Sequence, residues 1–344
     1  MSKIRLAKGD NPLDYFQPSV DFILKTQCSD GSIPWFTGGH LDPWDHAEAA
    51  MGLSIAGRYE EAIAAYKWSA DNQLKTGAWW AKYVDGQPVM DDEARYETNF
   101  IAYIATGVWH HYLITADRAF LEQMWPCVEP AINYVLSLQA ANGTITWAID
   151  HKGIAKPDAL VTGCSSVYKS IECAVNIAFA LGQAKPDWAT GRAALGDAML
   201  HHPERFDQSK ARYSMDWFYP ILTGVYQGQR ASEHITKHWD TFIKQDMGCL
   251  CVSDEPWVTV AESCELTMAL IATGKRDAAV ELFSWLHQFR SEDGVHWTGY
   301  QYDLDLLWPN EQPTWTAGAV LLAADALCDA TPASKIFTEV NLLG

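Results

Sequence analysis

The sequence lacks the features that mark several classes of protein. No uninterrupted apolar run approaches the roughly 20 residues that a membrane-spanning helix needs, and low-complexity tracts are absent. Basic residues are few: the chain has 25 Lys and Arg and 43 Asp and Glu, which gives a formal net charge of −18. Nucleic acids and anionic membrane surfaces attract clustered cations, so we expect neither as a partner. Residues 1–16 have no apolar core like that of a signal peptide, which predicts a cytoplasmic protein.

The eight cysteines are scattered and lack the spacing of a metal site. Cys173, Cys264 and Cys328 fall inside apolar helical patterns, where a thiol packs as a small hydrophobe. Cys249 and Cys251 have no second ligand pair at zinc-site spacing. We therefore expect reduced thiols, no metal and no cofactor.

Tryptophan is abundant, with 16 residues in a chain of 344 that is 48% hydrophobic. Flat indole rings suit the apolar faces of sugars, but they also fill large helical cores. The chain is long enough to bury such a core. Composition alone leaves both interpretations open, and the positions of the tryptophans in the chain have to decide between them.

Helical periodicity runs through the whole chain, and we predict one all-α domain over residues 1–344. Short extended pieces are expected near 78–84, 144–149 and 295–302. About twelve helices are predicted, over 13–27, 43–56, 59–74, 92–114, 117–140, 164–182, 187–201, 216–226, 229–244, 256–273, 275–290 and 313–329.

The connections between these helices alternate in length. Tight links occur around 56–58, 115–117 and 273–275, and long links separate the resulting hairpins. Tight links are typical of antiparallel helix pairs, whereas long loops in a compact domain are usually functional. Six such hairpins predict a closed (α/α)6 toroid whose site lies at the long-loop end.

An internal repeat supports the hairpin pattern. Residues 22–35 and 134–147 share the spacing aromatic-x4-Gln-x3-Gly-x3-Trp, residues 72–80 keep the Gln and Gly, and residues 283–297 form a looser copy. Gly suits the left-handed residue that ends a helix. The repeat is a strong indication of architecture and a weak one of function.

The starts of the even-numbered predicted helices are rich in Asp, Ser, Pro and Trp. Asp42, Asp91 and Ser253 fit ordinary N-caps, and Pro43 fits a first turn. Capping does not explain the tryptophans that follow at one end of the bundle, which are Trp44, Trp217, Trp257 and Trp315. Converging on a toroid axis, these starts would form a pocket of Trp, Asp and Glu. It could bind a sugar, or hold a carbocation against aromatic faces.

Two stretches resemble the (α/α)6-barrel glycosidases, most closely the glucoamylase-like family. WDHAEAAMGLSIAGRYEEA, from Trp44, is similar to that family's Trp-x-Arg-Asp helix start, although its Arg is absent. The resemblance implies that Asp45 holds sugar hydroxyls. NEQPTWTAGAVLLAADAL, from residue 310, is similar to the family's last helix and implies that Glu311 is the catalytic base. The family's general acid maps roughly onto Asp150, with Asp158, Asp216 and Glu262 as alternatives.

Glycoside hydrolysis needs two carboxyl groups across one bond, one to protonate the leaving oxygen and one to activate water or attack the sugar. We therefore predict a hydrolase acting on a neutral glycan or glycoside, with Glu311 and Asp150 as the catalytic pair. The oligomeric state stays open. The residues expected to bind substrate are Trp44, Asp45, His46, Asp92, Tyr96, Trp147, Asp216, Trp217, Trp257, Glu262 and Trp315.

Three other functions fit parts of the pattern. The Gln-Gly-Trp repeats resemble the QW motifs of squalene-cyclase and prenyltransferase toroids, although Asp303-Leu-Asp305 lacks the last Asp of a cyclase acid motif. A sugar epimerase would use paired histidines, for which the candidates are His46, His110, His111 and His296. A non-catalytic sugar-binding module is the third.

Overall fold

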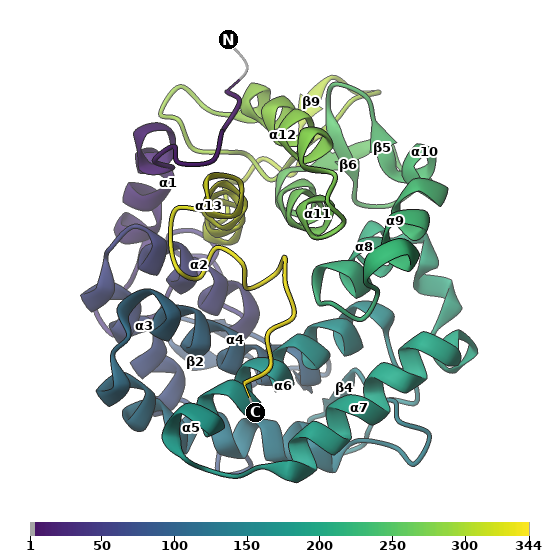
Figure 1. Ribbon diagram of the computed structural model, residues 1–344. Helices are drawn as coiled ribbons and strands as arrows, with labels where there is room; N and C mark the ends of the chain where they lie inside the picture. The colour runs from purple at the N-terminus through teal and green to yellow at the C-terminus, as the bar shows by residue number, and fades with distance from the viewer. Residues whose placement is uncertain (1–3, 344) are drawn as a thin grey trace.

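Six helices form a closed inner ring in the computed structural model, which describes residues 4–343 (Figure 1). Each inner helix contacts the next along the chain, and the last contacts the first, so the ring is complete. This confirms the predicted (α/α)6 toroid. The inner helices are α2 (Pro43–Ile55), α4 (Thr98–Thr115), α6 (Val161–Leu181), α8 (Ser214–Leu222), α11 (Val260–Ala272) and α13 (Thr314–Cys328).

An outer layer of helices covers this ring. Inner helices are buried on nearly all sides, as α13 is along almost its whole length, whereas outer helices such as α3 bury one face only. The described residues hold thirteen helices where about twelve were predicted, because the segment predicted at 229–244 is interrupted at His238. The remaining helices are α1 (Leu13–Thr26), α3 (Tyr59–Asp71), α5 (Arg118–Ser137), α7 (Pro186–His201), α9 (Gly228–Lys237), α10 (Trp239–Phe242) and α12 (Arg276–Trp285).

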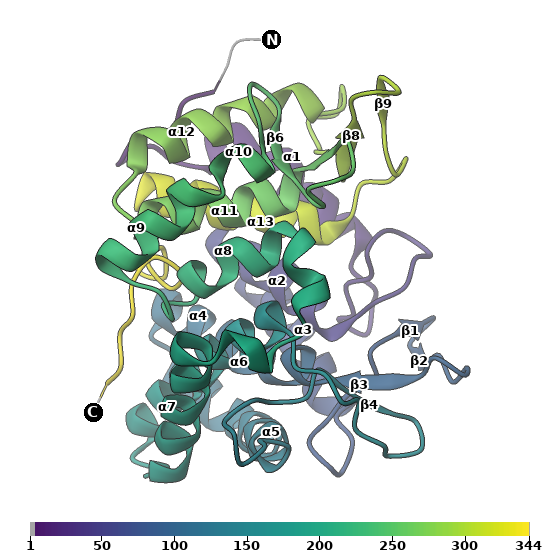
Figure 2. The same cartoon turned by 90° about the vertical axis from the view of Figure 1, so that its right-hand side faces the viewer.

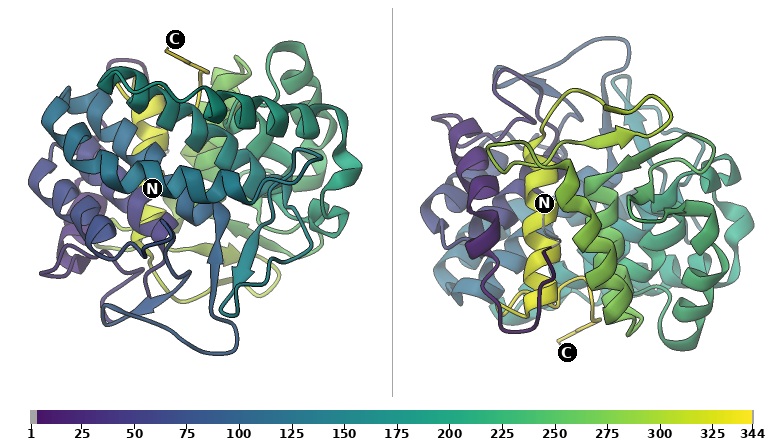
Figure 3. Two further views of the ribbon diagram at one scale, coloured as in Figure 1. Left: turned by 90° about the horizontal axis from the view of Figure 1, so that it is seen from below. Right: turned by 90° about the horizontal axis from the view of Figure 1, so that it is seen from above.

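Short antiparallel strands build the long-loop end of the toroid (Figures 2 and 3). β1 (Tyr83–Val84) pairs with β2 (Gln87–Pro88), and β3 (Arg95–Glu97) pairs with β4 (Ala148–Asp150). A five-stranded sheet follows the order β5 (Ile243–Lys244), β6 (Gly248–Leu250), β7 (Trp257–Thr259), β8 (Gly299–Gln301) and β9 (Leu306–Leu307). Helices were predicted to begin at 92 and 256, but β3 and β7 occupy those stretches. β3 pairs with the distant β4, and β7 pairs with the distant β8 as well as with the preceding β6, so local helical periodicity could not reveal them.

The Gln-Gly repeat joins neighbouring outer helices. Gln73 Nε2 donates to the carbonyl of Gly77 at 2.9 Å and to that of Cys127 on α5 at 2.8 Å. Gln27 and Gln139 make the same two kinds of contact. Gly77 has φ +94° and lies so close to Pro130 that a Cβ would be 2.4 Å from its carbonyl oxygen. The repeat therefore has a packing role.

The looser fourth copy has the same role with a different side chain. Arg290 stands four residues before Gly294, donates through Nε to its carbonyl at 3.0 Å, and reaches the carbonyl of Tyr15 through a second nitrogen at 3.1 Å. A guanidinium can thus bridge two carbonyls as the glutamine amide does.

Glycine permits the close contact of α2 with α13. A Cβ on Gly318 would lie 2.9 Å from the carbonyl oxygen of Glu48, and a Cβ on Gly52 would lie 3.3 Å from the Cα of Gly318. Because Gly lacks a Cβ, the two inner helices cross at backbone contact. This crossing sets the position of α2, which carries the first acidic residues of the site.

The C-terminal segment crosses the end of the toroid opposite the long loops (Figures 1 and 2). Lys169 Nζ donates to the Glu339 carbonyl at 3.0 Å, and Asn176 exchanges hydrogen bonds with the backbone of Asn341 and Leu343. This end of the axis is therefore covered by chain. The predicted domain limits, residues 1 and 344, lie outside the described range.

Among the helices of residues 4–343, none combines the length and the apolar character needed to cross a bilayer. A cytoplasmic location stays a prediction.

Candidate active site

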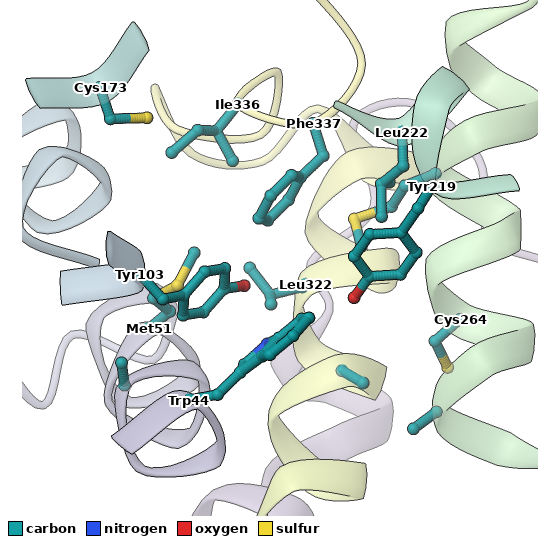
Figure 4. Close-up of a cluster of buried hydrophobic side chains, with 14 of the residues drawn as sticks. Trp44, Met51, Tyr103, Cys173, Tyr219, Leu222, Cys264, Leu322, Ile336 and Phe337 are labelled. Carbon is teal, nitrogen blue, oxygen red and sulfur yellow. The ribbon is translucent and has the colours of Figure 1, made fainter. Parts of the chain in front are cut away.

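Three aromatic side chains from different inner helices form a floor across the toroid axis. Trp44 of α2 lies 5.2 Å from Tyr103 of α4 and 5.9 Å from Tyr219 of α8, measured between ring centroids. Figure 4 shows the three rings grouped around the axis, with Phe337 of the C-terminal segment beyond them. The cavity between this floor and Phe337 has a volume of only about 10 Å³. It is no larger than a site for one water, so a sugar must bind on the long-loop side of the floor.

Two carboxyl groups lie buried beneath the floor. Glu48 accepts hydrogen bonds from Trp44 Nε1 at 3.2 Å and Tyr103 Oη at 3.3 Å, and Glu265 accepts one from Tyr219 Oη. Burial raises the pKa of Glu48 to about 8 and that of Glu265 well above its usual range. Glu48 is therefore mostly protonated at neutral pH, and burial favours the protonated form of Glu265 as well.

Asp45 lies above them, one helical turn before Glu48. Its backbone N–H donates to Asp42 Oδ1 at 2.9 Å, and Asp42 Oδ2 accepts from Trp35 Nε1 at 2.8 Å. Asp42 is thus the N-cap that its sequence predicts, followed by the first-turn Pro43. The Asp45 carboxyl also hydrogen-bonds that of Asp42. Burial first, and then the charge of Asp42, raise the pKa of Asp45 well above its usual range. Asp45 is therefore able to donate a proton.

Glu262 lies in the first turn of α11, one helical turn before Glu265, and the two carboxyl groups interact electrostatically. Its side chain is only 5% exposed, and its carboxyl accepts a hydrogen bond from the Cys251 thiol. Within the described residues its Oε2 is buried without a hydrogen-bond partner. Such an oxygen is costly unless water or substrate satisfies it. The positive end of the helix dipole favours a negative charge at this position.

These four acids follow one spacing. Asp45 and Glu48 are three residues apart on α2, as Glu262 and Glu265 are on α11, which places each pair on one helix face. Glu48, Glu265, Tyr103 and Tyr219 were absent from the predicted site. Isolated acids within almost wholly apolar helices were the signal that could have revealed Glu48 and Glu265, because such charges are rarely buried without a function.

A pocket of about 270 Å³ lies at the long-loop end, among the loops before α2 and α4. Its inner wall includes Asp42, Glu97 and Phe100, and Phe100 packs edge-on against Trp44. Its outer wall includes Val89 and Arg95. The volume is near the lower limit of ligand pockets, roughly 300 Å³. The pocket has room for a short glycan segment, and its lining includes Asp42 but neither Asp45 nor Glu262.

Glu311 and Trp315 lie at the mouth of the toroid. The ring of Trp315 is 6.3 Å from that of Trp35, and the Trp35 ring lies 4.3 Å from His40 at a tilt of 39°. The negative charge of Glu311 acts on His40, so its carboxyl is near this aromatic group. Glu311 is partly exposed, and its backbone carbonyl accepts from Thr298. The structure thus gathers Glu311, Trp315, Trp44, Asp45 and Glu262 at one end of the toroid.

Asp150 has contacts that do not suit a general acid. Its Oδ1 accepts from the backbone N–H groups of Lys152 and Ile154, both at 2.9 Å, and so closes the turn after β4. These hydrogen bonds lower its pKa, whereas an acid needs a raised one. The alternative Asp158 is exposed on the same loop. Glu262 is the alternative that shares a helix face with Glu265.

His46 is directed away from the pocket, contrary to its predicted place in the site. It is fully buried, its Nδ1 accepts from the Ile33 N–H at 3.1 Å, and its Nε2 lies 2.9 Å from the Ala65 carbonyl. Burial lowers its pKa to about 4. With both nitrogens bonded to backbone, His46 orders the loop before α2 and has no atom left for substrate.

Asp216 and Trp217 also serve packing. Asp216 Oδ1 accepts from the N–H and hydroxyl of Thr162, joining α8 to the start of α6. Trp217 stacks on Phe242 at 5.1 Å and donates to the His234 carbonyl. The Trp217 side chain therefore packs against the outer helices α9 and α10.

The other predicted binding residues lie in the loops around the mouth. Tyr96 stacks on Trp80 at 4.3 Å, and Trp147 carries the Arg95 guanidinium over its ring at 5.5 Å. Trp257 donates to the Trp308 carbonyl at 2.8 Å. Asp92 is exposed in the loop before β3. Among the described residues, none of these four side chains forms a hydrogen bond with Asp45, Glu48, Glu262 or Glu265.

The residues required by the rival functions do not converge on the site. His110, His111 and His296 are fully buried, as His46 is, and packed among core side chains. Asp303 and Asp305 lie on the exposed β8–β9 turn. No group of three or more His, Cys, Asp or Glu residues suited to hold a metal is found between residues 4 and 343.

Comparison with known proteins gives one close relative and many similar folds. No protein-family model matches the chain. It is 46% identical over 320 residues to the MMP endo-(1,4)-3-O-methyl-alpha-D-mannosidase of Mycolicibacterium hassiacum, which covers 93% of this chain and 88% of the relative.

Among solved structures, a glycosidase in complex with glucose matches 92% of this chain and 97% of its own, with TM-score 0.74 and 15% identity. A sugar epimerase from a ruminal bacterium matches 90% and 97%, with TM-score 0.65 and 10% identity. At these identities the structural matches support the fold alone.

Proposed function

The chain belongs to the glycoside hydrolase family of this mycobacterial mannosidase, and we propose that it cleaves internal (1,4) bonds in a polymer of 3-O-methyl-α-D-mannose. The identity over nearly the whole chain supports the substrate class. The chemistry rests on one observation, which is that α2 and α11 direct carboxyl groups at one aromatic-floored axial site. Glycosidic hydrolysis requires two such groups.

In our proposal Asp45 is the general acid and Glu262 the base. Asp45 gives its proton to the oxygen of the leaving sugar as the bond from that oxygen to C1 breaks. Glu262 takes a proton from the water that attacks C1, so one water is consumed and each product ends in a hydroxyl. The raised pKa of Asp45 keeps its proton available. The unpartnered Oε2 of Glu262 is free to accept from water.

Trp44 and the two tyrosines would support the sugar from below. An indole ring offers an apolar surface to the C–H groups of a pyranose, and Trp44 lies directly before Asp45 in the same helical turn. Glu48 and Glu265 lie beneath this floor, and negative charge on either of them raises the pKa of Asp45 further, which favours the protonated form that an acid needs.

Glu311 stays in the proposal as the alternative base, as its resemblance to the glucoamylase-like helix implies. Its place at the mouth beside His40 and Trp315 also suits a residue that binds the glycan. The two glutamates make different predictions. Loss of the base should reduce kcat, whereas loss of a binding carboxylate should mainly raise KM.

The decisive experiment compares Asp45→Asn, Glu262→Gln and Glu311→Gln on methylated α-(1,4)-mannan oligosaccharides. Asp45→Asn and Glu262→Gln should each lower kcat about 10²–10⁴-fold. A glycoside with a strongly acidic phenol as leaving group should restore turnover to Asp45→Asn but not to Glu262→Gln, because such a group departs without protonation. Asp150→Asn is the matched control and should retain wild-type rates.

Two outcomes would overturn parts of this proposal. Full activity of Glu262→Gln together with loss of activity in Glu311→Gln would transfer the base to Glu311. If the wild-type protein hydrolysed unmethylated mannan but no methylated glycan, the proposed substrate would be wrong. The anomeric configuration of the first product, read by NMR, separates water activation from attack by the carboxylate itself.

A further inference from the structure

Exposed apolar side chains are concentrated around the mouth of the toroid. Val84 and Tyr213 are among those at this end, and we define five others, which lie on or beside three strand pairs, as the apolar collar: Met90, Ile154, Leu304, Leu306 and Trp308. Leu304 is 66% exposed, Ile154 61% and Met90 58%. Single exposed apolar residues are ordinary, but a group of them at one end usually marks a binding surface.

The collar surrounds the entrance from different directions. Met90 follows the β1–β2 hairpin, Ile154 lies on the loop after β4, and the other three lie on or next to the β8–β9 hairpin. Figure 2 shows these strand pairs at separate positions of the long-loop end, and Figure 3 shows the same end from two further sides.

The β8–β9 hairpin is held in place although its side chains are exposed. Tyr300 of β8 pairs with Leu307 of β9, and its hydroxyl donates to Asp305 in the turn. Trp308 packs edge-on against Trp257 with 4.9 Å between centroids, and its carbonyl accepts from the Trp257 indole. A fixed loop loses little conformational freedom when a ligand binds to it.

The collar is also continuous with the proposed catalytic axis. Val89 lines the pocket of about 270 Å³ at the long-loop end and directly precedes Met90 in the chain. On the other side the chain runs from Trp308 to Glu311 and Trp315 within eight positions. Parts of the collar are thus close in sequence to residues of the mouth, and the proposal requires that a glycan bound at the axis reach it.

We propose that the collar binds the 3-O-methyl groups of mannose residues outside the bond that is cleaved, which rests on the proposed function. A methyl ether replaces a hydroxyl donor with an apolar group, and apolar side chains satisfy it better than the carboxylates of the axis. Complete burial of one methyl improves affinity on the order of fourfold. Because the glycan is neutral, the −18 charge of the protein offers it no long-range attraction, and contacts of this kind carry recognition.

The test uses Met90→Ser and Leu304→Ser, which lie on different loops, with Phe179→Ser as matched control. Phe179 is 58% exposed, as Met90 is, but lies near the end of α6. Each collar variant should raise KM for a long methylated oligosaccharide about two- to fivefold and leave kcat unchanged. Neither should affect an unmethylated oligosaccharide of the same length or a short aryl glycoside, and the control should match wild type.

Other results would overturn the collar proposal. These are an unchanged KM, an equal loss on methylated and unmethylated chains, or a fall in molar mass by light scattering in the collar variants, which would make the collar a contact between two copies of the chain. If wild type hydrolyses no methylated glycan, the proposed function fails. The collar is then tested by binding alone, and it stands only if methylated chains bind more tightly and the collar variants remove that preference.

Discussion

Trp44 Nε1 lies 3.2 Å from Glu48 Oε2, one helical turn further along α2, and donates a hydrogen bond to it. This contact joins the two layers of the candidate site. The indole ring forms the floor on which a sugar would rest, while its N–H satisfies a carboxyl buried beneath that floor. Tyr103 contributes the second donor to the same oxygen at 3.3 Å.

Trp44→Phe keeps an aromatic floor but removes one donor from the buried carboxyl. We expect the free energy of unfolding to fall by about 1–3 kcal/mol, because a buried acceptor loses a partner. Urea denaturation at pH 7 measures it. In the double variant Trp44→Phe/Glu48→Gln the two losses should not add, since both act on one hydrogen bond. Strict additivity would contradict this contact.

Glu48→Gln should change how stability depends on pH. The pKa of Glu48 is raised from 4.5 to about 8, so between these values the folded protein binds a proton that the unfolded chain releases. The resulting stabilisation is complete below about pH 4.5 and is lost as pH rises through about 8. The neutral amide has no such loss.

Thermal melts from pH 5 to pH 9 check this expectation. The melting temperature of Glu48→Gln relative to wild type should rise with pH and level off above about 8. Glu60→Gln, an exposed acid on α3, is the control and should run parallel to wild type. A constant difference between Glu48→Gln and wild type would show that Glu48 is charged throughout.

Gln73→Ala tests the packing role of the repeat. The substitution removes donors to two carbonyls, Gly77 and Cys127, so we expect a loss of about 1–3 kcal/mol in stability at unchanged kcat. Gln229→Ala, on an exposed helix surface, should stay within about 0.5 kcal/mol of wild type. A stable Gln73→Ala protein with impaired catalysis would instead give the repeat a direct function.

Gly318→Ala tests the crossing of α2 and α13. The new Cβ would lie 2.9 Å from the Glu48 carbonyl oxygen, and the two backbones would have to separate. Overpacking of this kind costs about 1–3 kcal/mol, and kcat should fall as well because α2 carries Asp45. Gly163→Ala is the control, since its Cβ would meet the nearest atom at 3.8 Å. Equal stability of both variants would contradict a close crossing.

The candidate site was foreseen only in part. The Asp42 cap, the first-turn Pro43 and the end of the toroid that carries the site followed from local rules. Asp45 and Glu262 were named among binding residues. The interpretation of His46 as part of the same wall does not agree with the structure, because a helix turns each successive residue by about 100°, so neighbours of a site residue can face the core.

Helix ends were less predictable than helices. The predicted starts at 92 and 256 are occupied by β3 and β7, whose partners are supplied by other hairpins of the toroid. Strand pairing is a tertiary contact, and it overrides local helical preference at these positions.

The sequence by itself determined the number and order of helical hairpins, because apolar periodicity and tight links are local properties. It also indicated which end carries the polar residues. Only the tertiary structure decided which of the many acids share one site. The pKa of a carboxyl depends on its desolvation and on charges from other helices, and Glu48 and Glu265 acquire those neighbours only when the ring closes and α2 and α11 lie on either side of α13.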